Sequence, residues 1–134
     1  MAAITRLILP LFAAAALLCA ALAGMAIVLA PESAVLVYQQ DDDIALRDIE
    51  RARSLRLTHH PAADYDFAVS PDGEQIAFVS RRDDLQEDIY LMDIDGGNLR
   101  NLSDDPGGDR SPRWSPDGKR LAYTPIDREF RTWK

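Results

Sequence analysis

Ser70-Pro71-Asp72-Gly73 decides the fold, because the same four residues return 45 residues later as Ser115-Pro116-Asp117-Gly118. A fixed long period is the sequence signature of a repeat architecture. An ungapped comparison of residues 43–77 with residues 88–122 gives 13 identities in 35 positions. The chain therefore contains an internal duplication, and the tetrapeptide occupies the same place in each copy.

The tetrapeptide has the chemistry of a tight turn between two strands. Proline fixes φ, aspartate can accept a bond from its own backbone, and glycine tolerates positive φ. The flanking segments alternate apolar and polar residues, as half-buried strands do. Asp95-Gly96 is a further hairpin-turn signal. We expect strands at 34–39, 44–49, 55–57, 67–69, 75–80, 88–93, 99–102, 112–114 and 120–124.

Four short antiparallel strands in each 45-residue copy are typical of a β-propeller blade. The predicted fold is all-β: an incomplete β-propeller of about two and a half four-stranded blades over residues 34–134. We expect a partial first blade at 34–64, a second at 65–109 and the start of a third at 110–134. The period places the start of the next strand at Lys134, the last residue of the sequence, so we expect a truncated propeller.

Two stretches carry a family resemblance. They are Trp114-Ser115-Pro116-Asp117-Gly118-Lys119-Arg120-Leu121-Ala122-Tyr123 and the segment 88–102. Both resemble the TolB-like β-propeller repeat, a Pro-Asp-Gly-containing, WD-like repeat. The resemblance implies a propeller of the bacterial cell envelope that binds proteins, as TolB binds the lipoprotein Pal and the Tol membrane proteins. The same repeat also occurs in the propellers of prolyl oligopeptidase-like and tricorn-type proteases.

The N-terminal run at residues 7–30 is uncharged and mostly aliphatic. As a helix it would span roughly 36 Å, enough to cross a hydrocarbon core of about 30 Å. We therefore expect a signal-anchor or transmembrane helix at 1–30 and a short spacer at 31–33. Arg6 precedes the run, and the positive end stays in the cytoplasm. This orientation places residues 31–134 outside the cytoplasm.

Cleavage of the same run is the alternative. Ala21-Leu22-Ala23 has the small-x-small pattern of a signal peptide site, and cleavage there would release the chain to the periplasm. It would leave Met25–Ala30 as an apolar stub, which favours the retained anchor. A second such pattern, Val28-Leu29-Ala30, is followed by Pro31, a poor residue after a cleavage point.

Composition excludes several classes of function. The net charge is −7, and Arg6 is the only charged side chain before residue 31, so the rest of the chain is acidic. An acidic surface repels phosphate backbones, which argues against nucleic-acid partners. Cys19 is the single cysteine, so neither an intrachain disulfide nor a cysteine metal site is possible.

Four other patterns have a functional and a structural interpretation. Asp93-x-Asp95-Gly96-x-Asn98 resembles a calcium loop but lacks the glutamate that such a loop has at its twelfth position, so a hairpin turn is favoured. His59-His60 has no partner triad nearby. Ser70 and Ser115 precede proline in the turn, outside any Gly-x-Ser-x-Gly elbow. The acidic cluster Asp83, Asp84, Glu87 and Asp88 lies beside Arg81 and Arg82, which predicts a solvated, mutually neutralised loop.

The aromatic residues Phe78, Trp114 and Tyr123 are expected in the blade cores. We therefore expect no catalytic, cofactor-binding or metal-ligating residue and no cofactor. The predicted function is a membrane-anchored, extracytoplasmic, protein-binding propeller segment. Its partner would be a cell-envelope protein, with the membrane contacted through residues 7–30, and it would form a homo-oligomer only if the chain is complete. The alternative is the front-end propeller of a signal-anchored prolyl oligopeptidase- or dipeptidyl peptidase-like serine peptidase whose hydrolase domain lies outside this chain.

Overall fold

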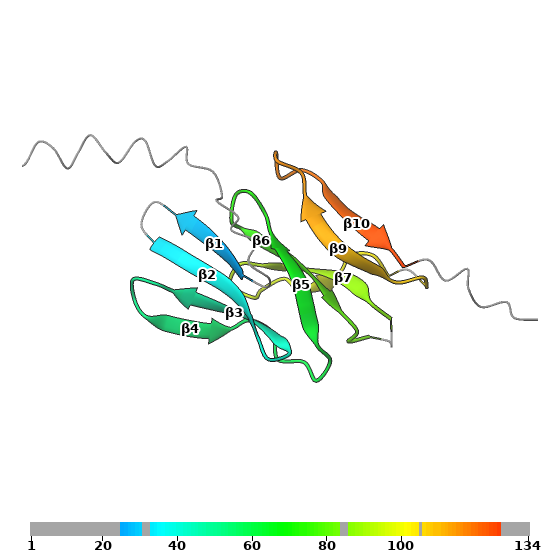
Figure 1. Ribbon diagram of the computed structural model, residues 1–134, viewed down its shortest axis with the longest axis horizontal. Helices are drawn as coiled ribbons and strands as arrows, with labels where there is room; N and C mark the ends of the chain where they lie inside the picture. The colour runs from blue at the N-terminus through cyan, green and yellow to red at the C-terminus, as the bar shows by residue number, and fades with distance from the viewer. Residues whose placement is uncertain (1–24, 31–32, 84–85, 105, 127–134) are drawn as a thin grey trace, which may run out of the picture.

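The computed structural model describes residues 25–30, 33–83, 86–104 and 106–126, and its regular structure there is β-strand (Figure 1). The first sheet has the order β1-β2-β3-β4, the second β5-β6-β7-β8, and the third pairs β9 with β10. The strands are β1 (Met25–Ala30), β2 (Ser33–Gln40), β3 (Asp43–Asp48), β4 (Arg53–Arg56), β5 (Asp64–Val69), β6 (Gln75–Ser80), β7 (Asp88–Asp93), β8 (Arg100–Asn101), β9 (Asp109–Trp114) and β10 (Leu121–Pro125). All pairings are antiparallel. The all-β, blade-like architecture predicted from the repeat is confirmed.

The expected helix at 1–30 is wrong for its last six residues, because Met25–Ala30 forms β1. This strand pairs with β2 in continuous register, from Met25 opposite Tyr38 to Ala30 opposite Ser33. The first sheet is therefore four-stranded and begins before residue 34, where the partial blade was expected to start. The rest of the expected helix, residues 1–24, lies outside the described residues. Within the described ranges, no helix is long and apolar enough to span a membrane.

Both copies of the tetrapeptide form the same hydrogen-bonded turn. Ser70 Oγ donates to Asp72 Oδ1 at 2.5 Å and accepts the Gln75 N–H at 2.9 Å, and Gly73 has φ 77°. In the later copy, Ser115 Oγ donates to Asp117 Oδ1 at 2.5 Å and accepts the Arg120 N–H at 3.0 Å. Ser70 and Ser115 are thus turn residues that join the first two strands of a blade, as the repeat predicted.

The core lies on both faces of the second sheet, which Figure 1 shows between the other two. Ile76 and Phe78 alternate with Ala77 and Val79 along β6, and all four are fully buried. Ile76 and Phe78 pack with residues of the first sheet, whereas Ala77 and Val79 pack near Trp114 of β9. Two-sided burial explains why β6 and β7 read as continuous apolar runs.

A side-chain bond closes the outer hairpin in both copies. Thr58 Oγ1 accepts the Ile44 N–H at 3.0 Å, and Ser103 Oγ accepts the Ile89 N–H at the same distance. Ile44 and Ile89 are fully buried, so each N–H needs this partner. The bond gives a physical reason for a hydroxyl residue at this position of the repeat.

Candidate functional site

A hollow of about 320 Å³ lies at the turn end of the second sheet, lined by Asp72, Glu74, Gln75, Asp93, Ile94 and Asp95. The β5–β6 turn supplies one wall and the start of the β7–β8 turn supplies the other. The two walls are joined by the Ile94 N–H, which donates to the Glu74 carbonyl at 2.8 Å. Gln75 also lies opposite Asp93 in the β6–β7 register. Adjacent strands therefore bring two acidic turns together.

Local hydrogen bonds hold the carboxylates of the hollow in place. Asp72 Oδ1 accepts from Ser70 Oγ and from the Glu74 N–H, and these bonds lower the pKa of the Asp72 carboxyl. Asp93 Oδ2 accepts from Asn98 Nδ2 at 2.5 Å, and Asp95 Oδ1 accepts the Gly97 N–H at 2.9 Å. Four acidic side chains and no basic one line this hollow. It is an electronegative concavity suited to the cationic side chains of a partner.

The calcium-like pattern is the β7–β8 hairpin turn. The Gly96 N–H donates to the Asp93 carbonyl at 2.9 Å, while Gly96 and Asn98 both adopt positive φ. The hairpin interpretation of Asp95-Gly96 is confirmed. Among the described residues, no group of three or more His, Cys, Asp or Glu side chains is placed to hold a metal ion.

The two histidines lie exposed in the loop that leads from the first sheet to the second. His60 Nδ1 accepts the Ala62 N–H at 3.1 Å, an interaction that shapes the loop itself. The sequence prediction of a polar loop at this position is consistent with that geometry.

The acidic cluster at 83–88 divides into different environments. Arg81 forms an ion pair with Glu87, as the predicted neutralised loop requires. Arg82 does not join it: its guanidinium donates to Asp64 Oδ2 at 2.8 Å, and the two side chains are 11% and 0% exposed. The assignment of Asp88 to a solvated loop is wrong, because Asp88 is buried in β7 and accepts from Asn101 Nδ2 at 2.9 Å. Asp84 lies outside the described residues.

The Asp64–Arg82 pair belongs to a polar network at the end of the second sheet opposite the hollow. Arg82 stacks over the rings of Phe78 and Tyr90, with its central carbon 5.3 and 4.8 Å from their centroids. Burial and the hydrogen bond to Asp83 raise the pKa of the Tyr90 hydroxyl. Two buried carboxylate oxygens here, Asp64 Oδ1 and Asp88 Oδ1, have no hydrogen-bond partner within the described part of the chain. These contacts link β5, β6 and β7 at this end of the blade.

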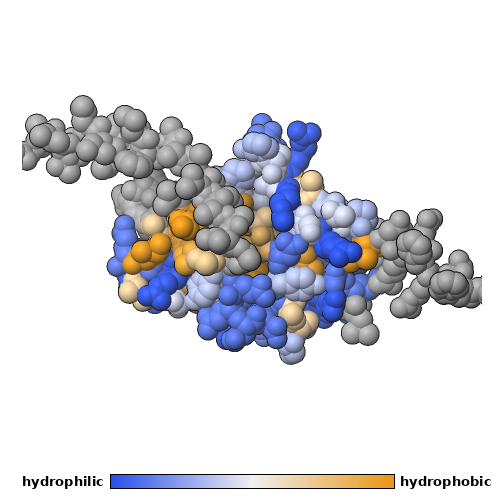
Figure 2. All heavy atoms as spheres, in the orientation of Figure 1, coloured by the Kyte–Doolittle hydropathy of each residue, from blue (hydrophilic) through white to orange (hydrophobic). Residues whose placement is uncertain are grey.

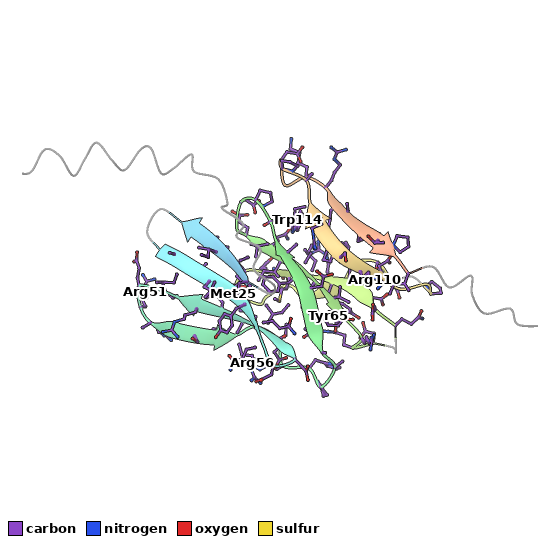
Figure 3. The ribbon with its side chains drawn as sticks, viewed as in Figure 1. Met25, Arg51, Arg56, Tyr65, Arg110 and Trp114 are labelled. Carbon is purple, nitrogen blue, oxygen red and sulfur yellow. The ribbon has the colours of Figure 1, made fainter. Side chains whose placement is uncertain are left out.

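The three aromatic residues assigned to the blade cores differ in burial. Phe78 is fully buried and stacks on Tyr90 with ring centroids 5.8 Å apart. Trp114, labelled in Figure 3, packs against the core and donates through Nε1 to the Ala68 carbonyl at 3.1 Å. Tyr123 is 41% exposed, so its assignment to the core is wrong. It lies on β10, the second strand of a sheet that has two strands in the described residues.

A second surface lies on the face of the first sheet opposite its core residues. Ala26 and Val28 are buried in the core, whereas Met25 and Ile27, which alternate with them along β1, are 43% and 37% exposed. Figure 2 shows hydrophobic side chains gathered over β1 and β2. Ile27 lies opposite Leu36, and Met25 lies opposite Tyr38, so two neighbouring cross-strand pairs form an apolar surface on this face.

The sequence did not predict either surface, and the reason differs between the two. The acidic pairs around 72–74 and 93–95 were each interpreted alone, and only the β6–β7 register brings them together. The register could have been inferred from the expected strands at 75–80 and 88–93. The apolar face was missed because Met25–Ala30 was assigned to the membrane run.

Comparisons with known proteins agree with this architecture. The family model described as TolB beta propeller domain matches residues 28–130, beginning inside β1. A protein assigned as TolB from Agrobacterium tumefaciens is 29% identical, with a TM-score of 0.61, over 76% of this chain and 37% of its own. This chain thus spans little more than a third of that protein. No curated protein matches the chain.

Two further solved structures share the fold. TolB from Acinetobacter baumannii is 24% identical, with a TM-score of 0.56, over 75% of this chain and 25% of its own. The tricorn protease is 20% identical, with a TM-score of 0.55, over 69% of this chain and 10% of its own. At these identities the likeness shows the fold alone.

Proposed function

The chain belongs to the TolB beta propeller domain family, and on this premise we propose that it is a protein-binding propeller segment of the cell envelope with no catalysis of its own. The acidic hollow between the β5–β6 and β7–β8 turns carries the proposal. Its lining includes Asp72, Glu74, Asp93 and Asp95. A basic segment of a protein partner is the ligand that complements such a surface.

The turns preorganise the side chains that line this hollow. The bonds to Asp72, Asp93 and Asp95 fix three carboxylates before any partner arrives. Binding of a partner therefore costs this chain little side-chain entropy, because these carboxylates are already ordered. Nucleic acid is a poor ligand here, because its phosphates and the carboxylates repel each other.

An extracytoplasmic location is part of the proposal. The apolar run that follows Arg6 supports export, with the blades on the outer side of the membrane. The proposal does not include a membrane anchor that extends through residues 7–30, because Met25–Ala30 is a strand of the first sheet. The peptidase alternative gains no support from the tricorn protease, since that likeness shows the fold alone.

Site-specific photo-cross-linking in bacterial cells tests the binding proposal. A benzoylphenylalanine at Glu74, an exposed position of the hollow, should form a discrete adduct with an envelope protein. Adding Asp95→Lys should suppress the adduct by reversing one charge of the surface. Asp42→Lys makes the same charge change in the exposed β2–β3 turn and should leave the adduct intact. Equal adduct yields from both charge variants would contradict the assignment of this surface.

A further inference from the structure

β10 has one edge without a strand neighbour in the part of the chain that the structure describes. Its neighbour there is β9, whereas β6, the equivalent strand of the second sheet, lies between β5 and β7 (Figure 1). The Arg120 carbonyl accepts the Ser115 N–H at 2.8 Å, and the Ile126 N–H donates at 2.9 Å to the residue before β9. Backbone groups alternate between the two sides of an antiparallel strand. The N–H and C=O groups of Leu121 and Tyr123 therefore point to the open edge.

The second sheet contains the strand that pairs with this edge in the repeat. At the 45-residue offset, Leu121 is the counterpart of Ile76, and Tyr123 is the counterpart of Phe78. β7 pairs with β6 along its whole length and places the Tyr90 ring against that of Phe78, with centroids 5.8 Å apart. A strand that fits beside β10 therefore has apolar side chains opposite Leu121 and Tyr123.

The side chains of β10 have room for such a strand. Leu121 packs against the buried apolar cluster that β6 and β7 form. Tyr123 lies two residues further on the same face and is 41% exposed, whereas its counterpart Phe78 is fully buried. A strand added beside β10 would cover Tyr123 as β7 covers Phe78. Pro125 ends β10 and has no N–H, so pairing is confined to the residues before it.

Charge defines one end of the added strand. Asp93 of β7 lies opposite Gln75, and the counterpart of Gln75 in the third sheet is Arg120. Arg120 and the preceding Lys119 are exposed, and neither takes part in an ion pair among the described residues. Opposite charges on directly facing residues stabilise a strand pair. An acidic residue at the carboxyl end of the added strand therefore fits this edge.

We propose that the open edge of β10 binds an extended segment of another protein as an added antiparallel β-strand. The segment has apolar side chains opposite Leu121 and Tyr123 and an acidic side chain opposite Arg120. In this kind of recognition, backbone hydrogen bonds supply affinity and alternate side chains supply specificity. The acidic hollow is lined by residues of other strands and turns, so this proposal does not depend on the binding proposed there.

A second copy of this chain is a poor donor of the added strand. Its β7 has the right pattern but is already paired with β6 on one side and β8 on the other. Its β10 is free at the same edge, yet Leu121–Pro125 contains no acidic residue to face Arg120. The partner is therefore a different protein with an exposed segment of the β7 pattern.

A synthetic peptide with the sequence of residues 86–95, blocked at both ends, is the probe. Added to the full-length chain, it should saturate at one peptide per chain and slow the amide exchange of Leu121 and Tyr123. An N-methyl group on peptide residue Tyr90 removes an N–H that faces β6 in the second sheet, and should weaken binding about tenfold. The same group on peptide residue Leu91, whose N–H faces the other way, should be tolerated.

A charge reversal in the chain tests the direction of the added strand. Arg120→Glu should weaken binding of the peptide severalfold, because it places like charges opposite each other. Arg53→Glu makes the same change at an exposed position of β4 and should leave binding near that of the wild type. Unchanged exchange of Leu121 and Tyr123 with the peptide in excess would overturn the proposal. Equal affinities of the two N-methyl peptides, or of the two charge variants, would also overturn it.

Discussion

Gly73 lies so close to Val28 that a Cβ on the glycine would come within 2.5 Å of Val28 Cγ1. The turn of the second sheet and the strand β1 therefore meet at a glycine. Val28 is buried and β-branched, so it has little freedom to move away. Gly118, at the same place in the later turn, has Pro71 Cδ as the nearest atom to such a Cβ, at an ordinary 3.6 Å.

Gly73→Ala should destabilise the protein more than Gly118→Ala does. Both glycines have positive φ, 77° and 68°, so both alanines pay about 1–2 kcal/mol of backbone strain. Only the first also clashes with Val28. Chemical denaturation of the two variants measures the difference in the free energy of unfolding.

The clash can be isolated with Val28→Ala. Combined with Gly73→Ala it should recover part of the loss, whereas combined with Gly118→Ala it should show no coupling. Equal losses of unfolding free energy in the two glycine variants, with no coupling to Val28→Ala in either pair, would contradict the contact between β1 and the turn at Gly73.

Arg82→Met should cost the protein about 3–5 kcal/mol, because it leaves the fully buried Asp64 carboxylate without its ion-pair partner. Arg113→Met is the matched control. Arg113 pairs with Asp66 at 3.4 Å, and its side chain is 64% exposed, so its loss should cost less than about 1 kcal/mol. Urea unfolding distinguishes the two. Similar midpoints for both variants would show that the Asp64–Arg82 pair is not buried.

Thr58→Val should destabilise the first sheet by about 1–3 kcal/mol, since it leaves the Ile44 N–H buried without its acceptor. Ser103→Ala should do the same to the Ile89 N–H in the second sheet. The exchanges Thr58→Ser and Ser103→Thr keep the hydroxyl and should cost much less. Thermal unfolding of the four variants tests whether the hydroxyls of Thr58 and Ser103 play the same role in the two sheets. If Thr58→Ser and Ser103→Thr lower the melting temperature as much as Thr58→Val and Ser103→Ala do, the hydroxyl bonds do not have this role.

Strong acid should weaken both Ser-Pro-Asp-Gly turns. The Ser70 hydroxyl and the Glu74 N–H lower the pKa of Asp72 below its ordinary 3.8, and Ser115 and Lys119 act likewise on Asp117. A lowered folded-state pKa gives stability that is present above the unfolded value. That stability is lost as the pH falls through the folded value.

Asp72→Asn should therefore flatten the dependence of the melting temperature on pH between about pH 5 and pH 2. Asp42→Asn, in the exposed β2–β3 turn, serves as the control and should leave the slope near that of the wild type. If the two variants have the same slope, the turn bonds of Asp72 do not persist in solution.

The repeat predicted most of the blade because its signals are local. The strands expected at 75–80 and 88–93 have the observed bounds, since turn residues flank each of them. The Ser-Pro-Asp-Gly turn was assigned correctly from the chemistry of its proline, aspartate and glycine. Both successes concern elements whose ends are defined by neighbouring residues.

The errors concern relationships between segments. β1 is continuous in sequence with an apolar run, and hydropathy alone cannot separate a core strand from a membrane segment. Arg82 was paired with its neighbours, although its partner Asp64 lies 18 residues away across the sheet. The acidic hollow required the β6–β7 register, which no single motif contains.

The central claim is that Met25–Ala30 is a strand of the first blade, and amide hydrogen exchange of the protein tests it most directly. In an antiparallel edge strand, alternate N–H groups bond to the neighbour, so about half of the β1 amides should be protected. Their protection should match that of the facing amides of β2 and should fall in Gly73→Ala. Complete exchange of Met25–Ala30 at the earliest time point, with β2 still protected, would contradict the account.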